Sequence, residues 1–267
     1  LDARGLVGVL KTERGEACRS IRDLAADVLR DFLKKRAAPG RTNSTGSASR
    51  VCGFTVTPPR GAGLTQEAIK EDLEDVLSLD YPTALYQLPQ ITENEMSPGT
   101  ISELAHRYPN FYLFKDTSGA DRVAHAPEST SDVFMVRGAE GDYARHLKAA
   151  GGSYDGFLLS TANSFPEELS QLIDLVLAGK HTEAQSLSSR IETVVTGVFE
   201  TVASLPFGNP FANANKAIDH VRAFHPSSLS VPPPMTHSGE RLPAEAVRRA
   251  ESLLGAHHFL PSTGYYV

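Results

Sequence analysis

The segment FYLFKDTSG, residues Phe111–Gly119, is a short apolar run that ends on a lysine and continues into small polar residues. Its first four residues are all apolar or aromatic, which is typical of a strand covered on both faces. A buried strand followed by a polar turn is a building unit of α/β folds. The segment therefore predicts a strand over Phe111–Asp116 with Lys115 at its carboxyl end.

Strand and helix patterns alternate on both sides of this segment. The predicted strands are Val51–Thr57, Thr83–Leu88, Phe111–Asp116, Val133–Arg137 and Gly156–Ser160. The helices predicted between and after them are Thr65–Leu79, Pro98–Arg107, Asp142–Ala150 and Pro166–Ala178. Such alternation is typical of parallel βα units. We expect an α/β protein with a TIM (β/α)8 barrel.

The rest of the chain has a helical pattern. The expected helices are His181–Ser204, Asn213–Phe224 and Pro243–Ala256. We therefore expect a barrel over residues 1–180, with an N-terminal part that is incomplete, and C-terminal helices over residues 181–267 that pack on the barrel.

Composition excludes several classes of function. The 267 residues carry a formal net charge of -6, which attracts no phosphate backbone, so no nucleic-acid partner is expected. Apolar runs such as Phe157–Leu159 are far shorter than the roughly 20 residues of a membrane span, so no membrane association is expected. Cys18 and Cys52 form no zinc pattern, and the histidines have no ligand spacing. We expect a cytoplasmic protein without a metal site.

Lys115 is the candidate nucleophile. In a βα barrel, catalytic groups sit at the carboxyl ends of the strands. Partial desolvation there disfavours the ammonium form and lowers the pKa of a lysine toward the range in which its amine attacks a carbonyl. The alternative is a surface lysine at a strand end.

Tyr86 lies in the preceding predicted strand, Thr83–Leu88. Inward-facing residues of neighbouring barrel strands lie side by side, so its hydroxyl is a candidate proton shuttle for the Lys115 amine. The alternative is a core tyrosine with a satisfied hydroxyl.

Taken together, these segments resemble the dihydrodipicolinate synthase and N-acetylneuraminate lyase family of Schiff-base-forming aldolases. The matching segments are Val56–Pro58, Leu85–Pro89, Phe114–Gly119 and Gly156–Asn163, in the family's order and spacing. The resemblance extends from about Arg50 to Ala223.

The resemblance implies that Lys115 forms an imine with pyruvate or a related 2-oxo acid, and that Tyr86 relays protons. It implies no cofactor other than this covalent imine, and it places backbone groups around Leu158 in the substrate pocket. Thr57, Gln90 and Arg60 are the remaining candidate substrate contacts, although Arg60 also fits a solvated loop arginine.

The sequence departs from the family pattern where some members carry an arginine after the strand proline. Here Pro89 is followed by Gln90 and Ile91, and neither side chain offers a bidentate fork to a second carboxylate. We therefore expect an aldolase or lyase that is not a true dihydrodipicolinate synthase.

Two other functions remain open. A sugar-acid dehydratase would use the same lysine, and a barrel without catalysis would serve as a binding protein. The expected ligand is a small-molecule 2-oxo acid, and the resemblance implies a homotetramer or homodimer.

Overall fold

The structure, a computed structural model, describes residues 53–128, 130 and 132–266. The beginning of the first predicted strand, at Val51, lies outside these residues. The described chain forms two compact units. The sheet unit contains residues 53–139 and 154–156, and the helical unit contains residues 140–153 and 157–266.

The sheet has five strands in the order β1-β2-β3-β4-β5. They are β1 (Phe54–Val56), β2 (Thr83–Gln87), β3 (Phe111–Asp116), β4 (Phe134–Arg137) and β5 (Gly156–Phe157). The pairs β1–β2, β2–β3 and β3–β4 are all parallel. Each strand therefore lies beside the next one in the chain, which is the strand order of a βα barrel.

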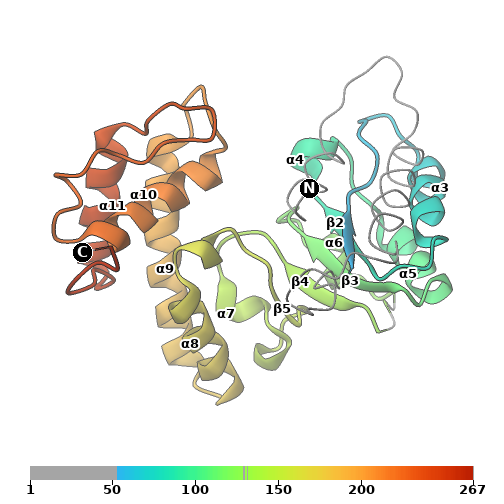
Figure 1. Cartoon of the computed structure of the whole chain (residues 1–267). Coiled ribbons are helices and arrows are strands. Elements are labelled where there is room, and N and C mark those ends of the chain that lie inside the picture. The colour runs from blue at the N-terminus through green and yellow to red at the C-terminus, as the bar shows by residue number, and fades with distance from the viewer. Residues whose placement is uncertain (1–52, 129, 131, 267) are drawn as a thin grey trace, which may run out of the picture. The chain divides into compact units, whose positions relative to one another are not determined.

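Helices α3 (Gln66–Leu77) and α5 (Pro98–Arg107) cover one side of this sheet (Figure 1). Leu85 and Phe114, both fully buried, belong to the same apolar core as residues from the two helices. The alternation of strand side chains thus sends one set of residues into this core and leaves the other set on the opposite face.

Local capping explains where the two helices begin. The side-chain oxygens of Thr65 and Ser97 accept hydrogen bonds from backbone N–H groups of the first helical turn. Such caps satisfy donors that have no partner within the helix. Two single-turn helices, α4 (Pro89–Thr92) and α6 (Arg122–His125), were not predicted, because four residues are too few to show a period.

The helical unit is built around the long helix α9 (His181–Val202), which packs against three other long helices. These are α8 (Pro166–Leu177), α10 (Pro210–Phe224) and α11 (Ala244–Ala256). Ile191, Val194 and Val198 of α9 are fully buried in the shared core. Their spacing of three and four residues is that of one helix face.

The predicted helix Asp142–Ala150 is wrong. The chain forms α7 (Tyr143–His146), breaks at the extended residue Leu147 and resumes as a 3-10 turn, η1 (Lys148–Ala150). Leu147 buries its side chain, and the backbone then returns so closely that a Cβ on Gly152 would lie 2.3 Å from the His146 carbonyl. Only glycine allows this approach.

The last predicted strand, Gly156–Ser160, is also shorter than expected. It ends at Phe157, and Ser160 begins the 3-10 turn η2 (Thr161–Asn163). The predicted domain boundary at residue 180 stays a prediction, since the two compact units are defined by contacts alone.

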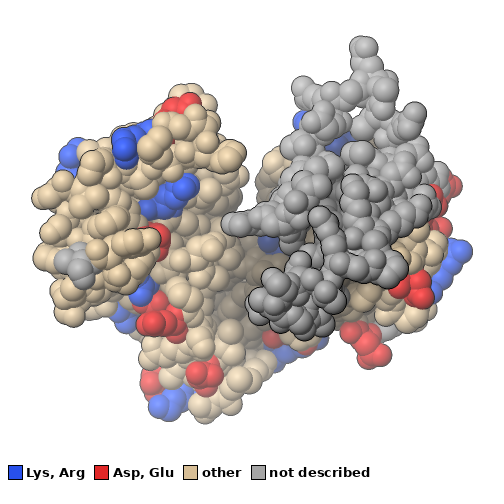
Figure 2. Space-filling view, viewed as in Figure 1, with Lys and Arg blue, Asp and Glu red and all other residues tan. Residues whose placement is uncertain are grey.

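The visible surface of the helical unit carries basic and acidic side chains in mixed positions (Figure 2). Within the described ranges, no helix combines the length and the apolar character needed to cross a membrane.

We expect Phe114→Ala to lower the free energy of unfolding by about 3–5 kcal/mol, because it leaves a cavity in a fully buried site. Urea denaturation measures this change. Leu177→Ala is the control, since Leu177 is 69% exposed and its truncation should change stability by less than about 1 kcal/mol. Equal losses in the two variants would contradict the assigned core.

Candidate active site

The predicted site residues of the sheet unit meet at the carboxyl ends of its strands. Tyr86 of β2 is the register partner of Lys115 of β3. Thr57 follows Val56 as Tyr86 follows Leu85, so Thr57 is level with Tyr86 on the neighbouring strand. Three predicted site residues therefore lie in one row, on the face away from α3 and α5.

The Lys115 amine faces the ring of Tyr86. Its Nζ atom lies 4.2 Å from the ring centroid, within the range of a cation–π contact. Lys115 and Tyr86 are both partly buried. The contact places the amine beside the ring of the tyrosine on the neighbouring strand. A proton relay also requires the hydroxyl to reach the amine, and this remains a prediction.

Gly138, directly after β4, forms a wall of the space around Lys115. A Cβ on Gly138 would lie 2.6 Å from Lys115 Cε and 2.3 Å from Thr117 Oγ1. Both distances are shorter than an ordinary van der Waals contact, so a larger residue at position 138 would require the Lys115 and Thr117 side chains to shift. The buried Thr117 hydroxyl has no hydrogen-bond partner among the described residues, which leaves it able to bind a ligand.

The loops after β1 and β2 are tied together. Arg60 forms an ion pair with Glu93 through Nε and Nη2, with the Nε–Oε1 distance at 3.0 Å. Asn94 Nδ2 donates to the backbone oxygens of Pro59 and Gly61, at 2.7 and 3.0 Å. Arg60 is thus engaged within the chain, and a substrate carboxylate would have to compete with Glu93.

Gln90 connects the next pair of loops. Its Nε2 donates to the backbone oxygen of Thr117 at 3.1 Å. The backbone N–H of Thr117 in turn donates to the backbone oxygen of Gln87 at 3.0 Å. Gln90 therefore holds the loop that follows Lys115. This positioning role was not predicted, because it depends on a contact between residues 27 positions apart.

Leu158 belongs to the helical unit and is 49% exposed. The segment after it is held by Glu140, whose carboxylate accepts hydrogen bonds from Ser160 Oγ at 3.0 Å and Thr161 N at 3.2 Å. The Tyr143 hydroxyl donates to the same carboxylate at 2.9 Å. Burial raises the pKa of the Tyr143 phenol, so it keeps the proton that it donates.

Asp116 points away from Lys115 into the interior of the sheet unit. Its carboxylate accepts the Ser118 N–H at 2.8 Å, and its Oδ2 lies 3.4 Å from the Tyr154 hydroxyl. Burial raises the pKa of the Asp116 carboxyl. The Tyr154 hydroxyl also lies 2.6 Å from Asp121, and a phenol has one proton to donate. The shorter of the two contacts is the one to Asp121, which therefore receives the Tyr154 proton.

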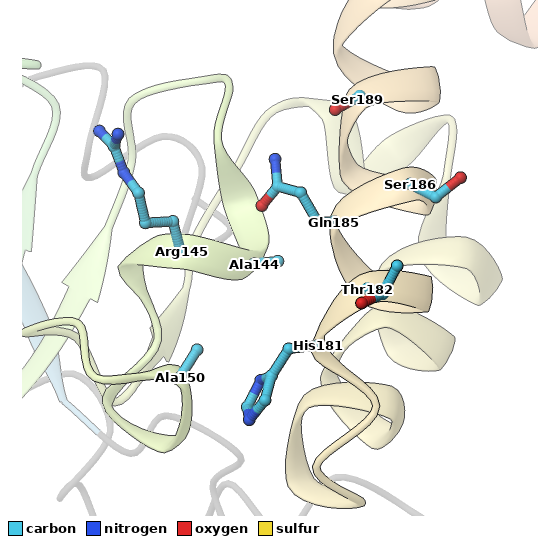
Figure 3. Close-up of a pocket in the computed structure, with 8 residues that line it drawn as sticks. All are labelled: Ala144, Arg145, Ala150, His181, Thr182, Gln185, Ser186 and Ser189. Carbon is cyan, nitrogen blue, oxygen red and sulfur yellow. The ribbon is translucent and has the colours of Figure 1, made fainter.

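The helical unit contains an open groove of about 510 Å³ between α7, η1 and the first turns of α9 (Figure 3). Its lining residues are Ala144, Arg145, Ala150, His181, Thr182, Gln185, Ser186 and Ser189. In Figure 3 the Arg145 side chain extends away from α9, and Asp142 forms an ion pair with it. The groove contains none of the predicted site residues. Within the described residues, no cluster of three or more His, Cys, Asp or Glu side chains fits a metal ion.

Known proteins resemble this chain in sequence. Residues 47–216 match the Dihydrodipicolinate synthetase family. The 4-hydroxy-tetrahydrodipicolinate synthase of Saccharophagus degradans is 30% identical over 178 residues, which are 66% of this chain and 57% of that protein. Its counterpart in Lactococcus lactis subsp. cremoris is 25% identical over 72% of this chain and 61% of that protein. The chain thus spans less than two thirds of the length of these relatives.

Solved structures resemble it in fold. Dihydrodipicolinate synthase from Thermotoga maritima aligns with a TM-score of 0.60 and 18% identity, over 79% of this chain and 68% of that chain. A catalytic-lysine mutant of the Ruminococcus gnavus sialic acid aldolase aligns with a TM-score of 0.57 and 16% identity, over 78% and 66%. Together the comparisons confirm the family resemblance and the predicted α/β fold class, for which the family's barrel is the expected architecture.

We expect Gly138→Ala to lower the free energy of unfolding by about 1–3 kcal/mol, because its methyl group collides with Lys115 and Thr117. Gly99→Ala is the matched control in helix α5, where an added Cβ meets nothing closer than 4.0 Å. That change should be neutral or stabilising. Thermal or urea unfolding of both variants measures the difference, and a neutral Gly138→Ala would contradict the close contact.

Asp116→Asn should change the dependence of stability on pH. A carboxyl whose folded-state pKa is raised binds more protons in the folded state, so its contribution to stability is full below its unfolded pKa and falls as pH rises through the folded value. Asn resembles the protonated carboxyl at every pH. The variant should therefore gain stability relative to the parent as pH rises from about 4 to 7. Urea unfolding across this range measures it, and a constant difference would contradict the raised pKa.

Proposed function

We propose that this chain, which belongs to the dihydrodipicolinate synthetase family, acts as a lyase whose Lys115 forms a Schiff base with pyruvate or a related 2-oxo acid. The observation that carries the proposal is the Lys115 amine, at the carboxyl end of a parallel strand and 4.2 Å from the Tyr86 ring centroid. Strand ends of this kind supply the catalytic groups of βα barrels.

The chemistry follows from the amine. Neutral Lys115 attacks the 2-oxo carbon, and the resulting carbinolamine loses water to give an iminium. The iminium accepts the electron pair released when a bond to the neighbouring carbon breaks, and an enamine forms. In the synthetic direction the enamine carbon attacks an aldehyde, and water then releases the product. Tyr86 is the proposed proton relay, and this series of reaction steps requires no organic cofactor or metal.

Thr57 and Thr117 are the proposed substrate contacts beside these two residues. The Thr117 hydroxyl supports this role because it is buried without a partner in the described part of the chain. Thr57 is level with Tyr86 on the neighbouring strand. Leu158 belongs to the helical unit, and its role stays an expectation from the family resemblance. Gln90 and Arg60 lie in the loops that follow β2 and β1. Gln90 donates to the loop after Lys115, and Arg60 is paired with Glu93.

We further propose that the substrate differs from that of the relatives named 4-hydroxy-tetrahydrodipicolinate synthase. After β2 the chain presents Gln90, which donates to a backbone carbonyl, and Ile91, an apolar side chain. Neither offers a bidentate partner to a second carboxylate. The proposed substrate is therefore a 2-oxo acid that needs no second carboxylate contact there, such as a sugar-derived 2-oxo acid. The expected homotetramer or homodimer stays a prediction, and one structural neighbour is a monomeric dihydrodipicolinate synthase variant.

Borohydride reduction in the presence of pyruvate should attach a pyruvate-sized mass to Lys115, because reduction converts the imine into a stable secondary amine. Peptide mass spectrometry locates the adduct. Lys115→Arg should abolish it, since a guanidinium does not form the imine. Lys180→Arg is the control, because Lys180 is an exposed lysine paired with Glu183.

The outcomes separate the alternatives. If Lys115 forms the adduct and the enzyme releases the substrate minus one water molecule, with its carbon chain intact, the protein is a dehydratase. Cleavage of a carbon–carbon bond would identify an aldolase. If Lys115 stays unmodified with pyruvate and with a panel of sugar-derived 2-oxo acids, the result would contradict the proposed enzymatic function. It would favour a binding protein.

A further inference from the structure

Four polar side chains are buried together behind Lys115 in the sheet unit. Asp116 and Tyr154 are fully buried, Asp121 is 4% exposed and Arg137 is 6% exposed. They come from four separate points of the chain: the end of β3, the loop that follows it, the end of β4 and the residues before β5. We call these four residues the Asp116 cluster.

The hydrogen bonds within the cluster are dense. Arg137 Nε lies 3.1 Å from Asp121 Oδ1, and Arg137 Nη2 lies 3.1 Å from Asp121 Oδ2, which is a bidentate ion pair. Arg137 Nη1 also donates to the Ala139 backbone oxygen at 2.9 Å. The Tyr154 hydroxyl donates to Asp121 at 2.6 Å and lies near Asp116. The cluster thus joins the carboxyl ends of β3 and β4.

Stability alone does not account for such a cluster. Removing two charges from water is costly, and apolar residues of similar volume often replace a buried ion pair with no loss of stability. What a buried ion pair does provide is one fixed geometry, because any shift leaves an unpaired charge in the interior. The location of the cluster therefore indicates its role.

A short series of contacts connects the cluster to Lys115. Asp116 is the next residue in β3, and its backbone oxygen accepts the Gly138 N–H at 2.6 Å. Gly138 follows Arg137 and faces the Lys115 side chain so closely that a Cβ there would lie 2.6 Å from Cε. A displacement of Arg137 would therefore also displace its neighbour Gly138, which lines the space around Lys115.

We propose that Asp121, Arg137 and Tyr154 are positioning residues for Lys115. They hold the ends of β3 and β4 in one register, and this register keeps the amine against the Tyr86 ring. The predicted effect on the reaction of Lys115 rests on the proposed function. The predicted effect on Gly138 does not, since it can be measured without substrate.

The test compares Tyr154→Phe and Arg137→Lys with the parent chain in two measurements. The first is the rate of borohydride-trapped adduct formation on Lys115 over a range of pyruvate concentrations. The second is amide hydrogen exchange at Gly138 and Thr117. Arg137→Lys keeps the charge but loses the two-pronged contact, so it tests the geometry even if Tyr154→Phe does not fold.

Both variants should lower the maximal trapping rate by about 10- to 100-fold, since small misplacements of a reacting group have effects of this size. The pyruvate concentration at half-maximal rate should change far less, and Gly138 should exchange faster. Asn110→Ala is the matched control: Asn110 Nδ2 donates to the Leu77 and Tyr81 oxygens at the opposite end of β3. It should lower stability while leaving the trapping rate unchanged.

Three results would overturn the proposal. They are a parental trapping rate in both variants, parental exchange at Gly138 in both variants, and an equal loss of trapping rate in Asn110→Ala. If the parent chain itself forms no adduct, the proposed function fails, and the exchange at Gly138 alone then decides whether the cluster holds that residue.

Discussion

The parallel pairing of β2 with β3, in the register that sets Tyr86 opposite Lys115, is the constraint on which the candidate site depends. The core enforces this register. Leu85 and Phe114 are also partners, both fully buried, and a shift by one residue would turn their side chains to the other face of the sheet. The apolar contacts that stabilise the sheet therefore also place the lysine beside the tyrosine.

The same alternation gives two adjacent residues opposite surroundings. Lys115 points to the face away from α3 and α5, where it meets Tyr86 and Gly138. Asp116 points the other way, into the buried interior, where loss of solvation raises the pKa of its carboxyl. The pleat thus gives the two neighbouring side chains separate surroundings, so the Asp116 carboxyl does not lie on the face that carries the Lys115 amine.

Short-range patterns were enough to predict part of this arrangement. The bounds of β3 and α5 agree with the sequence prediction, because an apolar run ends on a polar turn and a Ser-Pro pair begins the helix. The row of Lys115 and Tyr86 follows from strand order. The break at Leu147 was missed because it depends on a close backbone approach by Gly152. The Asp116 cluster was missed because its partners are up to 38 residues apart, although charged residues closing β3 and β4 were a visible signal.

A shared fold leaves the substrate to be decided by individual side chains. The two polar residues proposed as substrate contacts in the loops after β1 and β2, Arg60 and Gln90, already have partners within the chain. Using either for recognition would first break that contact, which reduces its net contribution to binding. The Thr117 hydroxyl carries no such cost, because it is buried and has no hydrogen-bond partner among the described residues. Selectivity should therefore depend more on groups directly beside Lys115 than on the charged loops above it.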